Sequence, residues 1–174
     1  MKDGTILLQK PNWELGKSLT DRVIRVIQAV TRSKYHHVVV WLDGYYWEST
    51  VWFVNGKMHH GVKKGKTIWH YDTVLEPTFE MSREQVEKIK GWFTEELKAG
   101  RGYNFFRLVM MLVIYPTRWF WGAIGWVPFS KGIYGEFCSS FVDKAMMKGG
   151  IDVVPGEFHG YTAPVDLLRT IEAG

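Results

Sequence analysis

This chain lacks several features that would assign it to a class at once. Its 174 residues include a single cysteine, Cys138, so no disulfide can form within the chain. The apolar run 108–115 is far shorter than the roughly 20 residues that a membrane-spanning helix needs. Residues 1–5 lack the apolar core of a signal peptide. We therefore expect neither a transmembrane helix nor a signal peptide, and one cysteine assigns no compartment.

The spacing typical of zinc sites is also missing. Six side chains could act as ligands, namely His36, His37, His59, His60, His70 and Cys138. None of them forms a CxxC or HxxxH pattern. Adjacent histidines on a strand point to opposite faces, which separates two of the pairs. We expect no metal and no cofactor.

Composition and charge indicate one globular domain, residues 1–174. Hydrophobic residues make up 46% and charged residues 23%, and no repeat or linker interrupts the chain. The net charge of +4 and the pI of about 9.1 suit an anionic partner such as a membrane or a cell wall. They do not indicate nucleic acid, and they leave the oligomeric state open.

The order of the expected elements predicts an α+β fold, in which an antiparallel sheet packs against helices. Asp43-Gly44 and Asn55-Gly56 are two-residue hairpin signals, and they predict an antiparallel meander. Ser82 and Gln85 fit a capping box, and Thr20 is the expected cap of the first helix. The expected strands are 5–9, 35–42, 45–54, 57–62 and 67–71. The expected helices start near Thr20, Ser82, Phe105, Cys138 and Pro164.

Cys138 lies at the start of an expected helix that ends at Gly149-Gly150. Residues 138, 141, 142, 145 and 146 share one face of this helix. The helix dipole and unpaired N–H groups at that end stabilise a thiolate. A buried structural cysteine is the alternative interpretation.

The first hairpin predicts which side chains meet. If Asp43-Gly44 is a two-residue turn, Val39 faces Glu48 and His37 faces Thr50, so His37 and Glu48 are diagonal neighbours on one face. His36 points to the other face. The second hairpin places His59 opposite Trp52, on the His37 face. The alternative is that His37 is a core histidine and Glu48 a charge at a strand edge.

These three side chains suit nucleophilic acyl transfer. A histidine takes the proton of the Cys138 thiol, and a carboxylate fixes the tautomer of that histidine and stabilises its charged form. We expect Cys138 as nucleophile, His37 as base and Glu48 as the residue that orients it.

Five short segments together resemble the NlpC-type papain-like superfamily, in its circularly permuted branch. That branch includes the YiiX-like and the lecithin:retinol acyltransferase-like proteins, in which His precedes Cys in the chain. Segment 35–42 is similar to the family strand S-H-V-G-I-Y-L, and 46–50 to V-x-E-A. Segments 102–104, 137–142 and 163–167 resemble the Y-D, x-C-S-E-L-V and P-x-D-L elements. Asn104, Ser140-Phe141 and the extra His36 depart from the pattern.

The resemblance implies a papain-like fold and a thioester intermediate at Cys138. It implies Tyr103 near the nucleophile, aiding the oxyanion, and Glu48 as the third residue, with His59 as the alternative found in the acyltransferase-like group. The implied substrates are peptide amides of cell-wall type or lipid acyl groups, by hydrolysis or transfer. A non-catalytic binding or structural module with the same fold is the other function class.

Aromatic residues are concentrated between Tyr103 and Cys138. Trp119-Phe120-Trp121 follows Pro116 among glycines, so we expect 119–129 to be a loop. Aromatic residues beside cations in such a loop suit a membrane interface or an acyl groove. Stacking on sugar rings and folding back onto the core are the alternatives. Run 108–115 is expected to be a core helix rather than an interfacial one.

Overall fold

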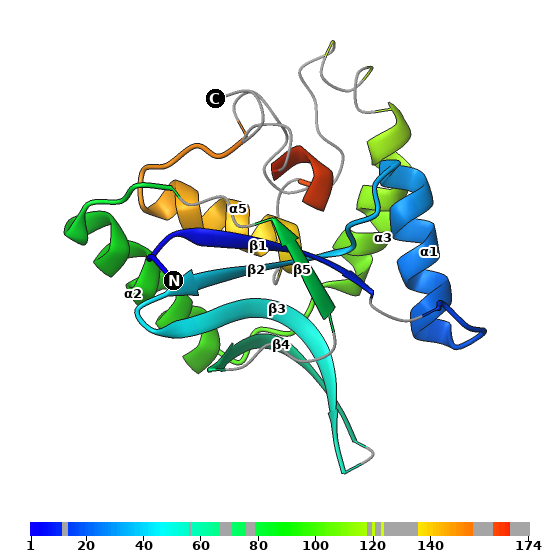
Figure 1. The fold of residues 1–174 in the computed structure, drawn as a ribbon, viewed down its shortest axis with the longest axis horizontal. Helices are drawn as coiled ribbons and strands as arrows, with labels where there is room; N and C mark the ends of the chain where they lie inside the picture. Colours follow the sequence, from blue (N-terminus) through cyan, green and yellow to red (C-terminus); the bar gives the residue numbers. More distant parts are fainter. Residues whose placement is uncertain are drawn as a thin grey trace.

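The structure is a computed structural model that describes residues 1–11, 14–55, 57–66, 71–75, 79–117, 120, 123, 136–154 and 162–167. It has an α+β architecture, with a five-stranded antiparallel sheet packed against helices (Figure 1). The strands are β1 (Thr5–Pro11), β2 (His37–Leu42), β3 (Tyr45–Val54), β4 (Lys57–Gly65) and β5 (Tyr71–Leu75). The helices are α1 (Leu19–Thr31), α2 (Arg83–Lys98), α3 (Phe105–Ile114), the 3-10 turn η1 (Tyr115–Thr117) and α5 (Cys138–Lys148).

Both hairpins form with the predicted registers. Leu42 pairs with Tyr45, and Asp43 and Gly44 both have positive φ, which a tight hairpin turn of this kind requires. Val54 pairs with Lys57, and this register continues along β4 to its far end. Strands β2, β3 and β4 therefore form the expected meander.

The last strand departs from the expected meander. The sheet order is β4-β3-β2-β1-β5, so β5 pairs with β1 at the opposite edge from β4. β5 also begins at Tyr71 rather than at Thr67, and 67–70 lie outside the described residues. Local turn signals fix neighbouring strands, but they carry no information on a connection that crosses the sheet.

The main core lies between the sheet and helices α2 and α5. Strand residues such as Val38, Val40 and Trp47 pack there against Phe93 of α2 and Phe141 of α5. The rings of Trp47 and Phe93 stack at 5.0 Å, and those of Phe93 and Phe141 stack at 4.9 Å. This packing holds α5 against the central strands.

The helix ends follow from local chemistry. The Ser82 capping box with Gln85 is present, and Gly100 follows α2 with positive φ. The cap of α1 is Ser18 instead of Thr20, because its hydroxyl accepts the N–H of Asp21. Residues 164–167 are helical, as expected, and 168–171 lie outside the described residues.

Helix α3 buries only one of its faces, whereas the sequence predicted a core helix. Leu108, Met111 and Ile114 are buried, whereas Val109 and Val113 are exposed. Asn104 caps α3 by accepting the N–H of Arg107. Among the described residues, no helix has the length and apolar character to cross a bilayer.

Candidate active site

Cys138 is the first residue of α5, as predicted. The residue before it, Phe137, has an extended backbone and no side chain that can cap the helix. The first helical hydrogen bond is that of Phe141 N–H to the Phe137 carbonyl. The N–H groups of residues 138–140 therefore stand at the positive end of the helix dipole, beside the thiol.

His37 and Glu48 form the predicted pair. His37 Nε2 lies 2.8 Å from Glu48 Oε2, and both side chains are largely shielded from solvent. Strands β2 and β3 supply the two residues at the diagonal position given by the Asp43-Gly44 turn. Glu48 also lies 3.7 Å from the Nζ of Lys63, its partner on β4.

The His37 ring also interacts with Cys138. Burial by itself lowers the pKa of His37, but the charge and hydrogen bond of Cys138, with those of Glu48, raise it to about 10. Because Nε2 is bonded to Glu48, Nδ1 is the ring nitrogen left for the thiol. Burial raises the pKa of Glu48, but the hydrogen bond and charge of His37, aided by Lys63, bring it below its usual value. The neighbouring Cys138 and Glu48 therefore favour the protonated form of the His37 ring.

His36 occupies a different environment from His37. Burial, and next the charge of His37, lower the pKa of His36 to about 3. Its ring is therefore neutral at physiological pH. Its backbone carbonyl lies 3.8 Å from the Cys138 sulfur, which ties the start of β2 to the start of α5. The prediction that His36 and His37 point to opposite faces of the strand agrees with the different environments of their rings.

Glu136 anchors the start of α5, two residues before Cys138. The two oxygens of its carboxylate accept hydrogen bonds from Arg107 Nη1, at 3.1 and 3.0 Å. The carboxylate also accepts hydrogen bonds from the Ser140 hydroxyl and the Lys144 ammonium group. Its carbonyl accepts the hydroxyl of Ser49 on β3 at 2.7 Å. The carboxylate is neutralised by two cations, so it does not oppose a thiolate as an unpaired charge would. Sequence reasoning missed this cluster, because no local pattern links residues 107 and 136.

Tyr103 lies at the edge of the Cys138 cluster. Its ring packs against the buried group that includes Cys138, Phe137 and Leu108. Its backbone N–H donates to His60 Nδ1 at 3.1 Å. Gly61, with φ 126, lets this segment approach β4, because a Cβ there would meet the Arg101 carbonyl at 2.5 Å. A glycine inside a strand was the available sequence signal for this contact.

His59 of β4 pairs with Trp52 of β3, as the second hairpin predicts. Its side chain is exposed, and Glu48 is the residue bonded to His37. Within the described part of the chain, no group of three His, Cys, Asp or Glu side chains is arranged to hold a metal ion. His70 lies outside those residues.

Gln9 is a further polar residue beside the pair. It is the β1 partner of His37, so their side chains share a face of the sheet. It is 0% exposed, and neither side-chain atom has a hydrogen-bond partner among the described residues. The pairing of β1 with β5 is irregular at Leu8 and Gln9. No local sequence pattern indicates that this amide is buried, since its burial depends on the order of the strands.

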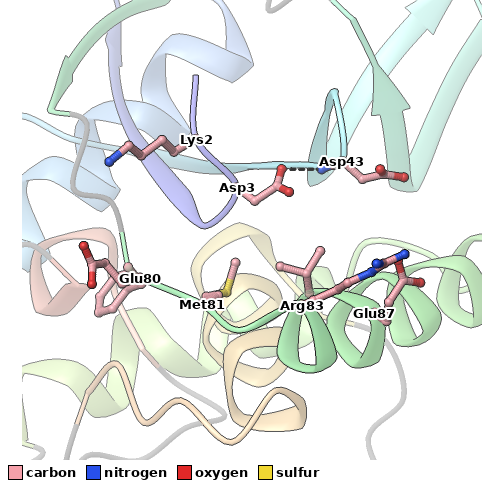
Figure 2. A pocket seen from close by; sticks show the side chains of 9 residues that line it. Lys2, Asp3, Asp43, Glu80, Met81, Arg83 and Glu87 are labelled. Atoms are coloured by element: carbon pink, nitrogen blue, oxygen red, sulfur yellow. Dashed lines mark hydrogen bonds between the residues drawn. The ribbon is translucent and has the colours of Figure 1, made fainter.

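A cavity of about 670 Å³ lies at the other end of β2 from His37. Figure 2 shows the side chains that line it, with Lys2 and Arg83 among carboxylates that include Asp3 and Asp43. Asp3 accepts the backbone N–H of Asp43 at 2.7 Å, and the Asp43 carboxylate pairs with Lys90. These contacts support the β2–β3 turn, away from the Cys138 thiol.

The aromatic segment 119–129 is described only at Phe120 and Ala123, and both are helical rather than in a loop. Trp119 and Trp121 lie outside the described residues. Comparison of the chain with models of known families, with curated proteins and with solved structures gave no match.

Proposed function

We propose that this protein is a cysteine-dependent hydrolase or acyltransferase of the permuted papain-like type. Cys138 is the nucleophile, His37 the general acid and base, and Glu48 the residue that orients His37. The observation that carries the proposal is the 2.8 Å bond of His37 to Glu48, combined with the interaction of the same ring with Cys138.

The chemistry follows from these positions. The thiolate attacks the carbonyl carbon of an acyl substrate, a C–S bond forms, and the carbonyl electrons move to oxygen. In this proposal the N–H groups at the start of α5, with Tyr103, stabilise that oxyanion. The bond to the leaving amine or alcohol then breaks, and the leaving group takes the proton of His37.

The second half of the proposed reaction breaks down the thioester and returns the enzyme to its starting state. Water, or an acceptor hydroxyl or amine, gives a proton to His37 and attacks the thioester carbon. The C–S bond breaks, and the thiolate is regenerated beside the imidazolium. The proposed substrates are peptide amides of cell-wall type or lipid acyl groups, in line with the family resemblance.

One observation favours a second function. Cys138 is 3% and His37 6% exposed, so the thiol is poorly accessible in this conformation. A non-catalytic binding or structural module with this fold would keep such a thiol buried and inert.

Alkylation of the sole cysteine separates the two functions. With iodoacetamide at neutral pH, we expect the folded protein to react about tenfold faster than a free cysteine, which is only a few per cent thiolate. His37→Ala removes the base and should abolish the fast reaction. His36→Ala is the matched control and should leave it intact, because that ring is neutral and buried.

Intact-mass measurement over time reads the extent of labelling, and circular dichroism checks the fold of each variant. Labelling only after unfolding would overturn the enzymatic proposal and favour the binding module. Equal losses in the two histidine variants would overturn the assignment of His37 as base.

A further inference from the structure

Helix α3 carries an apolar face that the protein core does not cover. Phe105, Phe106, Val109 and Val113 are 46, 52, 53 and 61% exposed. They lie on the side of the helix opposite to the buried Leu108, Met111 and Ile114. Large apolar side chains are rarely exposed together on one face without a partner.

Helix α1 packs beside α3 (Figure 1) and has exposed apolar side chains of its own. Its Ile27 lies in the buried cluster with Leu108 and Met111 of α3. Its Leu19, Val23 and Val26 are exposed at helical spacing. We call the exposed apolar side chains of α1 and α3 the helix-pair surface.

Positive charge is concentrated on α1 and the residues that flank it. Residues 15–34 contain five cations and one acid, a net charge of +4 that equals the net charge of the whole chain. The acid, Asp21, is buried and accepts the hydroxyl of Ser18, whereas Lys17, Arg22 and Arg25 are exposed. Residues 105–117 contain no acid.

We propose that the helix-pair surface docks on an anionic lipid bilayer. The phenylalanines and valines of α3 enter the boundary between headgroups and acyl chains, and the cations of α1 contact lipid phosphates. Amphipathic helices with apolar and basic faces bind bilayers through these two contributions. A second copy of the chain fits less well, because it would bring two sets of α1 cations together.

This surface adjoins the candidate active site. The rings of Phe105 and Tyr103 are in tilted contact, with 5.1 Å between their centroids, and the buried face of α3 packs in the same cluster as Cys138. Docking through α3 would therefore hold the nucleophile near the bilayer surface, where an acyl substrate would be supplied. This last step rests on the proposed function, whereas the docking itself does not.

Vesicle co-sedimentation tests the docking. We use vesicles of phosphatidylcholine and phosphatidylserine in equal parts, and vesicles of phosphatidylcholine alone. The wild type should bind the anionic vesicles more tightly. Phe106→Ser with Val113→Ser should weaken this binding about tenfold or more. Met58→Ser with Met147→Ser is the matched control, because these side chains are similarly exposed, outside α1 and α3, and should bind as the wild type.

A second variant tests the contribution of the α1 cations to vesicle binding. Lys17→Gln with Arg22→Gln should weaken binding to anionic vesicles about tenfold and have little effect on neutral ones. Cys138→Ser should bind as the wild type, so a failure of the chemistry and a failure of the docking remain distinguishable. Absence of vesicle binding, or equal losses in the α3 and control variants, would overturn the proposal. Loss of a dimer in the α3 variant, seen by sedimentation velocity without vesicles, would assign the surface to a second copy instead.

Discussion

His37 Nε2 and Glu48 Oε2 lie 2.8 Å apart across the β2–β3 hairpin, and this bond leaves the second ring nitrogen of His37 for Cys138. The bond has a direct consequence for charge. Burial lowers the pKa of the His37 ring, but the interactions with Cys138 and Glu48 raise it by more, so the protonated imidazole is favoured.

Replacing Glu48 by Gln should lower the pKa of His37 and shift the pH dependence of alkylation. The change removes a charge and a strong hydrogen bond that raise the His37 pKa. The alkaline limb of the rate profile should therefore move to lower pH, with an intermediate loss of rate at pH 7. The measurement is the iodoacetamide rate as a function of pH.

His59→Ala is the control for this experiment. Its side chain is exposed on β4, so its loss should leave the rate profile unchanged. A silent Glu48→Gln variant together with an impaired His59→Ala variant would make His59 the third residue.

Folding stability should fall as pH rises from about 6.5 to about 10. The pKa of His37 is raised from 6.5 to about 10, so the folded state holds this proton more tightly than the unfolded state. That contribution is fully present below 6.5 and is lost as pH rises through 10. Urea midpoints measured across this range should show the decline, and His37→Ala should flatten it.

His36 should act in the opposite direction at acid pH. Its pKa is lowered from 6.5 to about 3, so its contribution is present above 6.5 and is lost as pH falls toward 3. His36→Ala should weaken the acid decline without affecting the alkaline one. A single variant that flattens both limbs would contradict the separate environments of the two rings.

The Arg107–Glu136 pair should be worth far more to stability than a surface pair. Arg107→Ala removes the double hydrogen bond to the buried Glu136 carboxylate, which keeps Lys144 and Ser140 as partners, so the cost should be about 1.5–3 kcal/mol. Lys88→Ala is the matched control. It breaks the exposed pair of α2 with Glu84 and should have little effect on stability. Free energies of unfolding from urea titration give both values, and similar losses would show that Lys144 and Ser140 are sufficient to stabilise the Glu136 carboxylate.

Gln9→Met should increase stability. The amide of Gln9 is buried without a hydrogen-bond partner among the described residues, so replacing it by an apolar group of similar size should gain about 1–2 kcal/mol. Gln28→Met is the control, because the Gln28 amide donates to the Lys34 carbonyl at 2.6 Å. That variant should be neutral or slightly destabilised. Destabilisation by Gln9→Met would indicate that the amide has a bonding partner, such as a buried water.

The sequence by itself determined the local parts of this protein. Asp43-Gly44 set the register of β2 and β3. A two-residue turn fixes which residues pair, and because side chains alternate between the two faces of a strand, the pairing also fixes which side chains share a face. That was sufficient to bring His37 and Glu48 together. The glycine before Cys138 and the apolar spacing after it likewise placed the thiol in the first turn of α5.

Only the tertiary structure decided the non-local parts. The pairing of β5 with β1, the burial of Gln9 and the contact of Arg107 with Glu136 join residues that no turn or helical period connects. The apolar run of α3 predicted a core helix, but the molecule covers only one side of it. Periodicity indicates which residues share a face, whereas the number of neighbouring elements decides whether that face is buried.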